Sequence, residues 1–272
     1  MKQILLFAIL SITILSVQGQ KQKSPTLDIK AFNEKFEQVR WLCEYDRVAW
    51  VTSDSVMKED KTEMARLGSE WFCFQAQDSL WHAVYGKYAA GRFDQVFHYI
   101  VGHDGLVKRV KSQVDTALVN THSRGLIVAN QALQPIKANT SIRFNQFIKR
   151  NPDNTLSVWM LPAFQTNGVA VYGGEFYYQI SPEGTRILTK QEYYQGQFRG
   201  FKTDTPRDIS LGYEDVEQPT WGSIFFVWYY KSYFTKIFIE NKAIRSTAFR
   251  NENKSYSWFH VELPPTKKSK GR

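Results

Sequence analysis

The hydrophobic period of this chain changes near Ser69 from a helical spacing to an alternation of two, and most of the later sequence keeps the second pattern. Runs rich in aromatic and β-branched residues are separated by turn residues, which is typical of antiparallel strands. The expected strands are residues 70–75, 80–88, 92–101, 106–110, 141–149, 155–161, 169–180, 185–188, 221–230, 233–240, 243–250 and 255–263. We therefore expect largely antiparallel, twisted sheets.

Three helices are expected beside the sheets. Apolar residues recur every three to four positions over residues 29–43, which predicts an N-terminal helix. Ser112 and Asp115 resemble a capping box, so a mid-chain helix should begin there and end near Gly125. A shorter helix is expected over residues 55–67. The sequence thus predicts an α+β fold with an N-terminal helix and a mid-chain helix.

The N-terminus has the pattern of a secretory signal peptide. Lys2 is followed by an uncharged stretch from Ile4 to Val17, which is shorter than the ~20 residues that a membrane-spanning helix needs. Small residues at Val17 and Gly19 predict cleavage after Gly19. The mature protein is therefore expected to be soluble and extracytoplasmic, either periplasmic or secreted. No later apolar stretch reaches membrane-spanning length.

Residues 20–26 read as a linker, residues 27–263 as a single α+β domain, and residues 264–272 as a basic, disordered tail. A subdivision near residues 135–140 is the alternative to a single domain. The formal net charge is +9, but eight of the 35 basic residues lie in the two ends of the chain. The body over residues 31–263 is nearly neutral, which argues against a nucleic-acid partner.

Cys43 and Cys73 are the only cysteines. Export permits a disulfide between them, yet both lie in apolar surroundings and fit equally well as buried, unbridged residues. The sequence leaves both alternatives open.

Several stretches of the second half resemble a family of uncharacterised exported bacterial proteins. They are Arg143 to Phe147, Val158 to Pro162, Val171 to Phe176 and Gly184 to Leu188, within residues 141–190, with a further likeness over residues 219–239. Members often carry a His-Thr-His run before the segment matching Pro219, whereas this chain has Asp208-Ile209-Ser210-Leu211 there. The resemblance implies an exported bacterial protein and carries no assigned activity.

A metal site is the first chemistry to test, because His82, His98 and His103 lie in one strand-rich segment. If Ala90 and Gly91 form a two-residue turn, His82 pairs with Tyr99 and the first two histidines face opposite sides of the sheet. A one-residue bulge would return them to the same side. The pattern favours structural histidines, so no metal and no cofactor are expected. Motifs for nucleophilic catalysis and for phosphate or dinucleotide binding are also missing.

Four residues are candidates for ligand binding. Glu175 follows two glycines in an apolar strand, so a ligand could approach it closely; the alternative is an outward-facing residue beside a β-bulge. Trp159, Tyr172 and Tyr177 could form an aromatic platform for a sugar or a peptide, although most aromatic residues of a sheet protein pack in its core.

These observations predict a non-catalytic binding or structural protein of the cell envelope or the secretome, with an unknown protein or an envelope polymer as its partner. The alternative is an envelope hydrolase whose site is assembled from dispersed acids or histidines. A deep cleft with convergent carboxylates or histidines would favour the hydrolase, and a groove lined with aromatic side chains would favour binding.

Overall fold

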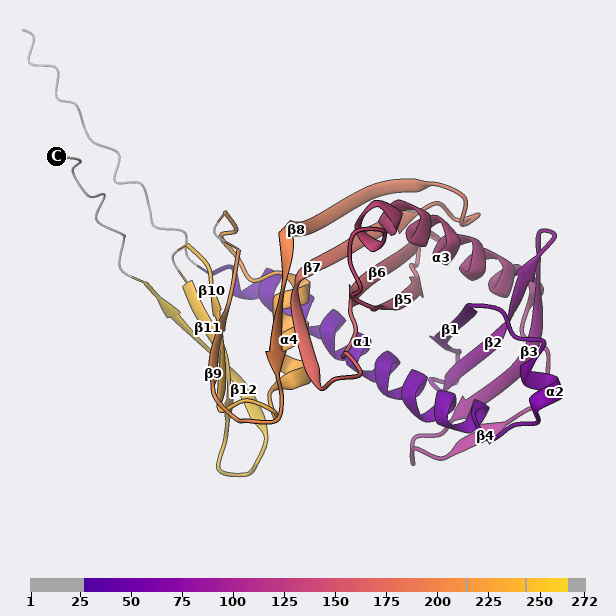
Figure 1. The fold of residues 1–272 in the computed structure, drawn as a ribbon, viewed down its shortest axis with the longest axis horizontal. Coiled ribbons are helices and arrows are strands. Elements are labelled where there is room, and N and C mark those ends of the chain that lie inside the picture. Colours follow the sequence, from indigo (N-terminus) through magenta and orange to yellow (C-terminus); the bar gives the residue numbers. More distant parts are fainter. Residues whose placement is uncertain (1–26, 214, 243, 264–272) are drawn as a thin grey trace, which may run out of the picture.

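The computed structural model describes residues 27–213, 215–242 and 244–263, which form four helices and three four-stranded sheets (Figure 1). This arrangement confirms the α+β fold with an N-terminal and a mid-chain helix. The expected signal peptide, linker and basic tail lie outside the described residues. Within the described part of the chain, no helix is both long and apolar enough to cross a membrane.

Sheet A is an antiparallel meander in the first half of the chain. Its strands, in sheet order, are β1 (Glu70–Gln75), β2 (Trp81–Ala89), β3 (Arg92–Val101) and β4 (Val107–Arg109). All four were expected from the period of two. Ala90 and Gly91 have positive φ angles of 51° and 79°, as a tight hairpin turn requires.

Sheet B contains the longest strands. Its order is β5 (Phe144–Arg150), β6 (Leu156–Pro162), β7 (Val169–Ile180) and β8 (Ile187–Lys202). The two glycines of β7 were expected to mark a bulge or a close backbone approach; a bulge is present, because the β7–β8 register shifts between Tyr172 and Gly174 and Gly173 has a φ of 108°. Strand β8 continues far beyond the expected residues 185–188.

Sheet C is built from the last part of the chain. Its order is β12 (Tyr256–Glu262), β11 (Ile244–Arg250), β10 (Lys236–Glu240) and β9 (Asp208–Leu211). Strand β9, which was not expected, pairs with β10 in parallel, and the other pairs are antiparallel. β9 is only four residues long, which leaves little periodic signal to detect.

Helix α1 (Ile29–Val56) connects the two ends of the molecule and passes beneath sheet B in the view of Figure 1. It continues past the expected residues 29–43 and ends at Val56, at the start of the range 55–67 where a separate helix was expected. Only the short α2 (Lys61–Met64) remains of that prediction. The Asp28 side chain accepts a hydrogen bond from Ala31 N at 2.9 Å and caps the start of α1.

Helix α3 (Thr116–Lys137) covers one face of sheet B and continues past Gly125, contrary to the expected end there. Asp115 is its N-cap. Gly125 lies against the sheet, and a Cβ atom at this position would come within 2.8 Å of Leu156 Cδ1. This glycine therefore permits close helix–sheet packing instead of ending the helix.

Helix α4 (Trp221–Tyr230) replaces an expected strand over residues 221–230. The prediction was wrong because a short, continuous apolar run has no period that separates a buried strand from a buried helix. Thr220 and Ser223 form a capping box, with Ser223 N donating to Thr220 Oγ1 at 3.2 Å and Thr220 N donating to Ser223 Oγ at 2.9 Å.

Hydrogen bonds of buried residues join α1 to the sheets and to α4. Cys73 N donates to the Tyr45 hydroxyl at 2.9 Å, which ties β1 to α1. Asp46 accepts from Asn145 Nδ2 of β5 at 2.8 Å and from the Tyr229 hydroxyl of α4 at 2.5 Å. Because α1 is held on several sides, the surface that it shares with sheet B has a defined shape.

Candidate functional site

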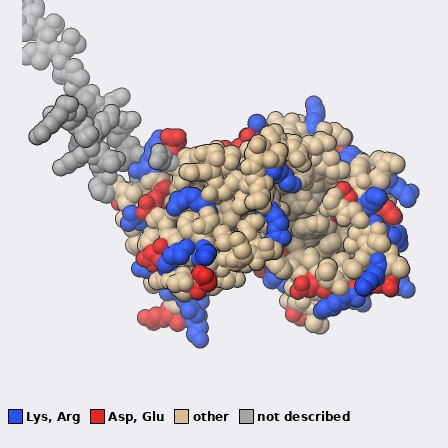
Figure 2. All heavy atoms as spheres, viewed as in Figure 1, with Lys and Arg blue, Asp and Glu red and all other residues tan. Residues whose placement is uncertain are grey.

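A groove runs along α1 where this helix faces sheets A and B and helix α4. It consists of two adjoining hollows of about 230 and 470 Å³, which share Gln38, Trp41 and Lys149. In the space-filling view the molecule is hollowed between the part that carries sheet A and the rest, with Lys and Arg side chains at the border (Figure 2). We call the two hollows together the tryptophan groove, because they are lined by Trp41, Trp81, Trp159, Trp221 and Trp228.

Helix α1 forms one wall of the tryptophan groove. Residues three to four positions apart lie on the same side of a helix, which brings Gln38, Trp41 and Glu44 to this wall. The Trp41 ring centroid is 5.4 Å from that of Trp81 and 6.2 Å from that of Trp159. Trp41 is thus the central ring of the groove.

Sheet B forms the opposite wall, and its period of two decides which residues face the groove. Trp159 of β6 is the cross-strand partner of Tyr177 of β7, and Ser157 of β6 is the partner of Lys149 of β5. These four side chains therefore lie on one face of the sheet. The ring centroids of Trp159 and Tyr177 are 5.3 Å apart, and Trp221 of α4 lies 5.1 Å from Tyr177.

Polar groups are spaced between the rings. Asn151 Nδ2 donates to Ser157 Oγ at 3.0 Å, and Ser157 Oγ lies 3.1 Å from the Tyr177 hydroxyl. Lys149 Nζ lies 5.3 Å from the centre of the Trp41 ring, which is a cation–π arrangement. The groove therefore combines aromatic faces with hydrogen-bonding groups.

Two donors of the lining are left without partners. The indole nitrogens of Trp159 and Trp221 are buried, and neither has a hydrogen-bond partner among the described residues. Most buried polar atoms in native proteins do have a partner, supplied by protein or by ordered water. Because both nitrogens are enclosed, an ordered water is the partner that could complete them.

The four binding candidates divide into two pairs. Trp159 and Tyr177 line the tryptophan groove, although Trp159 is itself only 4% exposed, whereas Tyr172 and Glu175, with exposed fractions of 4% and 5%, do not line it. The space beside Glu175 and Tyr172 amounts to about 10 Å³, which is room for a water molecule at most. Glu175 is thus neither outward-facing nor accessible to a ligand larger than water.

Glu175 instead holds the N-terminus of α4. Thr220 Oγ1 donates to one carboxylate oxygen at 2.5 Å, and Gly222 N donates to the other at 2.6 Å. A Cβ atom on residue 222 would lie within 2.6 Å of the Glu175 side chain, so only glycine fits there. Burial raises the pKa of Glu175 to about 7, although hydrogen bonds from Thr220, Gly222 and Tyr213 and the charge of Lys35 lower it.

The histidines of sheet A lie on the same face, contrary to the expected register. A bulge between Tyr85 and Gly86 shifts the β2–β3 pairing, so His82 pairs with Ile100 instead of Tyr99. His82 Nδ1 lies 2.8 Å from His98 Nε2, and burial lowers the pKa of both histidines. Among the described residues no group of three or more His, Cys, Asp or Glu side chains is arranged to hold a metal ion.

Two acids line the tryptophan groove, and both lie on α1. Glu37 and Glu44 are seven residues apart, which places them roughly 10 Å apart along the helix axis. Each has an arginine partner, Arg40 at 3.1 Å and Arg47 at 2.9 Å. Hydrolysis by a carboxylate pair requires side chains about 5 to 9.5 Å apart on either side of a scissile bond. These paired surface acids do not have that arrangement.

Both cysteines are free thiols in the structure. Cys73 is fully buried in β1, and Cys43 lines the larger hollow of the tryptophan groove. Burial raises the pKa of Cys43 to about 12 and that of Cys73 well above its ordinary value. Neither cysteine is therefore activated as a nucleophile.

No sequence pattern selects Trp41, Lys149, Asn151 or Trp221 as site residues. Trp41 lies within the predicted N-terminal helix, but the other tryptophans of the groove lie at least 40 positions away in the sequence. Trp221 was assigned to a strand. The only signal available was the high number of tryptophans, eight in 272 residues. Comparison of the chain with known protein families, with curated proteins and with solved structures finds no match.

Proposed function

We propose that this chain is an exported, non-catalytic binding protein whose tryptophan groove holds an uncharged segment of a cell-envelope glycan. The observation that carries the proposal is the concentration of five of the eight tryptophans in the lining of one groove. The two hollows together fall within the range of ligand sites, about 300 to 1,000 Å³. Export is supported by the N-terminal sequence pattern.

A glycan fits the chemistry of the groove better than a charged ligand does. The apolar faces of sugar rings pack against aromatic rings, and sugar hydroxyls can both donate and accept hydrogen bonds. Ser157, Asn151 and Gln38 supply uncharged polar groups. The charges of Glu37 and Arg40 already neutralise each other.

The arrangement of charged groups in the tryptophan groove favours binding over hydrolysis. The groove presents rings, neutral donors and the cation Lys149, whereas its two carboxylates lie on one helix and are paired with arginines. A site that breaks a glycosidic bond would need one acid and one base converging on that bond.

The test is a titration followed by intrinsic tryptophan fluorescence, which reports on the groove because most of the tryptophans line it. Soluble β-linked oligosaccharides of glucose and of N-acetylglucosamine are the probes. Trp41→Ala should weaken binding about tenfold or more, since aromatic anchors carry at least the ~1.4 kcal/mol that corresponds to a factor of ten.

Trp50→Ala is the matched control, because Trp50 lies on the same helix but is 57% exposed and does not line the groove. A second variant, Gln38→Ala with Lys149→Ala, changes exposed groove residues and covers the case in which Trp41→Ala fails to fold. The proposal fails if no neutral oligosaccharide binds at millimolar concentration, or if Trp50→Ala weakens binding as much as Trp41→Ala does.

Extracytoplasmic location has its own test. The full chain is expressed in a bacterial host and the cells are fractionated. The expected product begins at Gln20 and is recovered in a soluble fraction outside the cytoplasm. A chain that keeps Met1 and stays in the cytoplasm would contradict export.

A further inference from the structure

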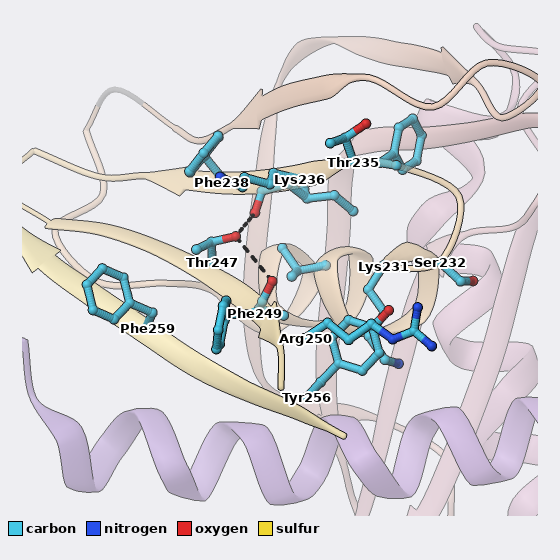
Figure 3. Close-up of a pocket in the computed structure, with 14 residues that line it drawn as sticks. Lys231, Ser232, Thr235, Lys236, Phe238, Thr247, Phe249, Arg250, Tyr256 and Phe259 are labelled. Atoms are coloured by element: carbon cyan, nitrogen blue, oxygen red, sulfur yellow. Dashed lines mark hydrogen bonds between the residues drawn. The ribbon is translucent and has the colours of Figure 1, made fainter. Parts of the chain in front are cut away.

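A second hollow lies at the end of sheet C, where β10 and β11 diverge beside the C-terminus of α4 (Figure 3). Its volume is about 1020 Å³, larger than either hollow of the tryptophan groove. We call it the strand slot. Its lining includes Lys231, Lys236, Phe249, Arg250 and Phe259.

The strand slot exposes an open strand edge. The β10–β11 register ends at the pair of Phe238 and Thr247, whereas β11 continues to Arg250 beside β12 alone. Thr247 Oγ1 donates to Ile237 O at 2.8 Å, where the two strands separate (Figure 3). The last residues of β11 therefore have a neighbouring strand on one side only.

The hydrogen-bonding pattern shows which backbone groups face the slot. Asn251 N donates to Ser255 O at 2.8 Å, so residues 251 and 255 form a hydrogen-bonded pair in the β11–β12 hairpin. Because such pairs alternate along an antiparallel ladder, Arg250 turns its N–H and C=O away from β12 and toward the slot. An exposed edge of this kind accepts a further strand.

Side chains around this edge are apolar on one face of the sheet. Phe249 and Phe259 are 57% and 59% exposed. In the β11–β12 register Thr247 pairs with Phe259, and Phe249 lies two residues beyond Thr247, so both rings lie on the same face. Alternate side chains of an added strand would meet these rings.

All charged residues that line the strand slot are basic. Lys231, Lys236 and Arg250 line it, and no Asp or Glu is among its lining residues. Neither Lys236 nor Arg250 forms an ion pair with a carboxylate of the described residues. The C-terminal segment 264–272 has no acid and four basic residues, so like-charge repulsion opposes its binding here.

We propose that the strand slot binds an extended, acidic peptide segment of a partner protein, which adds to β11 as a further strand. Main-chain hydrogen bonds to the open edge supply the pairing, and alternate apolar side chains of the peptide pack on Phe249 and Phe259. Carboxylates of the peptide meet the cations of the slot. This site is separate from the tryptophan groove and does not depend on its ligand.

The test is fluorescence anisotropy with a short fluorescein-labelled peptide in which Val and Glu alternate. The double variant Lys236→Glu with Arg250→Glu should weaken binding about tenfold or more, because it reverses the charge that attracts the peptide. Both residues are exposed, so the variant should fold, which circular dichroism checks. The double variant Lys58→Glu with Lys108→Glu makes the same change of net charge at exposed sites near sheet A, and it should bind as the parent protein does.

A second peptide tests the strand pairing itself. N-methylation of alternate residues removes main-chain donors and keeps the side-chain charges, so this peptide should bind at least tenfold more weakly. Equal binding of the two peptides would show attraction by charge alone and overturn the proposal. Failure of the unmodified peptide to bind at millimolar concentration, or equal losses in the two double variants, would overturn it as well.

Discussion

Replacement of Glu175 by glutamine should change how the stability of this protein depends on pH. Glu175 is buried, and its pKa is raised from 4.5 to about 7. The folded protein therefore keeps the proton on this carboxyl up to about pH 7, whereas the unfolded chain releases it near pH 4.5. Between these values the folded state binds more protons, so the free energy of unfolding falls as the pH rises. The difference in pKa corresponds to about 3 kcal/mol.

Asp46 and His122 are buried groups with shifted pKa values in the same region, and their effects must be separated from that of Glu175. The pKa of Asp46 is raised to about 6 by burial, which also lowers stability as the pH rises. The pKa of His122 is lowered to about 4 by burial, which has the opposite effect between about pH 4 and 6.5. The informative quantity is therefore the difference in free energy of unfolding between Glu175→Gln and the parent protein, measured at each pH.

Urea unfolding at several pH values from 5 to 8 measures this difference. Relative to the parent protein, Glu175→Gln should gain about 2 to 3 kcal/mol between pH 5 and pH 8, because glutamine carries no charge to bury. Glu183→Gln is the control: Glu183 is exposed and its pKa is lowered, so its titration lies below this range and its difference should stay flat. A flat difference for Glu175→Gln would refute the assignment of a buried carboxyl with a raised pKa.

Three further predictions concern the fold. Gly184→Ala should destabilise the protein by about 2 kcal/mol or more, because residue 184 has a φ of 76° and its new Cβ would lie 2.4 Å from a backbone oxygen of α3. The control Gly91→Ala has a φ of 79° but open space around it, so it should cost only about 1 kcal/mol. Equal losses of the two variants in thermal unfolding would contradict this contrast. Thr220→Ala should lower the free energy of unfolding by about 1 to 2 kcal/mol, because it removes the N-cap of α4 and a hydrogen-bond donor to the buried carboxyl of Glu175. An unchanged midpoint of urea unfolding would argue against this capping role. Cys73 should react with a thiol reagent at pH 8 only after unfolding, because it is buried and its pKa is raised. Cys43 lines the groove, but its pKa of about 12 should make it react much more slowly than a free thiol. Rapid modification of either cysteine in the native protein would contradict this prediction.

In sheet A the sequence pattern predicts the positions of the strands but not their register. The alternation of apolar and polar residues located its four strands within one or two residues. The pairing of His82 with Ile100, however, depends on a bulge between Tyr85 and Gly86. Where a strand takes up an extra residue is decided by packing on both faces of the sheet, and the alternation itself carries no mark of it.

Two glycines also show which features the local sequence predicts and which depend on tertiary packing. Gly173 was expected to mark a bulge or a close backbone approach; it lies at a bulge, and its φ of 108° explains the choice of residue. Gly125 was expected to end a helix, yet its role is to let α3 approach Leu156 on sheet B. Both positions carry the same residue type, and only the neighbouring segment distinguishes a turn from a close contact.

The sequence by itself determined the α+β class, the position of most strands and the start of α1, because backbone geometry imposes these periods residue by residue. Only the tertiary structure decided that residues 221–230 form a helix, that Glu175 is buried at its N-terminus, and that Trp41, Trp159 and Trp221 meet in one groove. These outcomes depend on contacts between segments far apart in the chain. Such contacts are set by the packing of whole elements, which no local pattern of residues records.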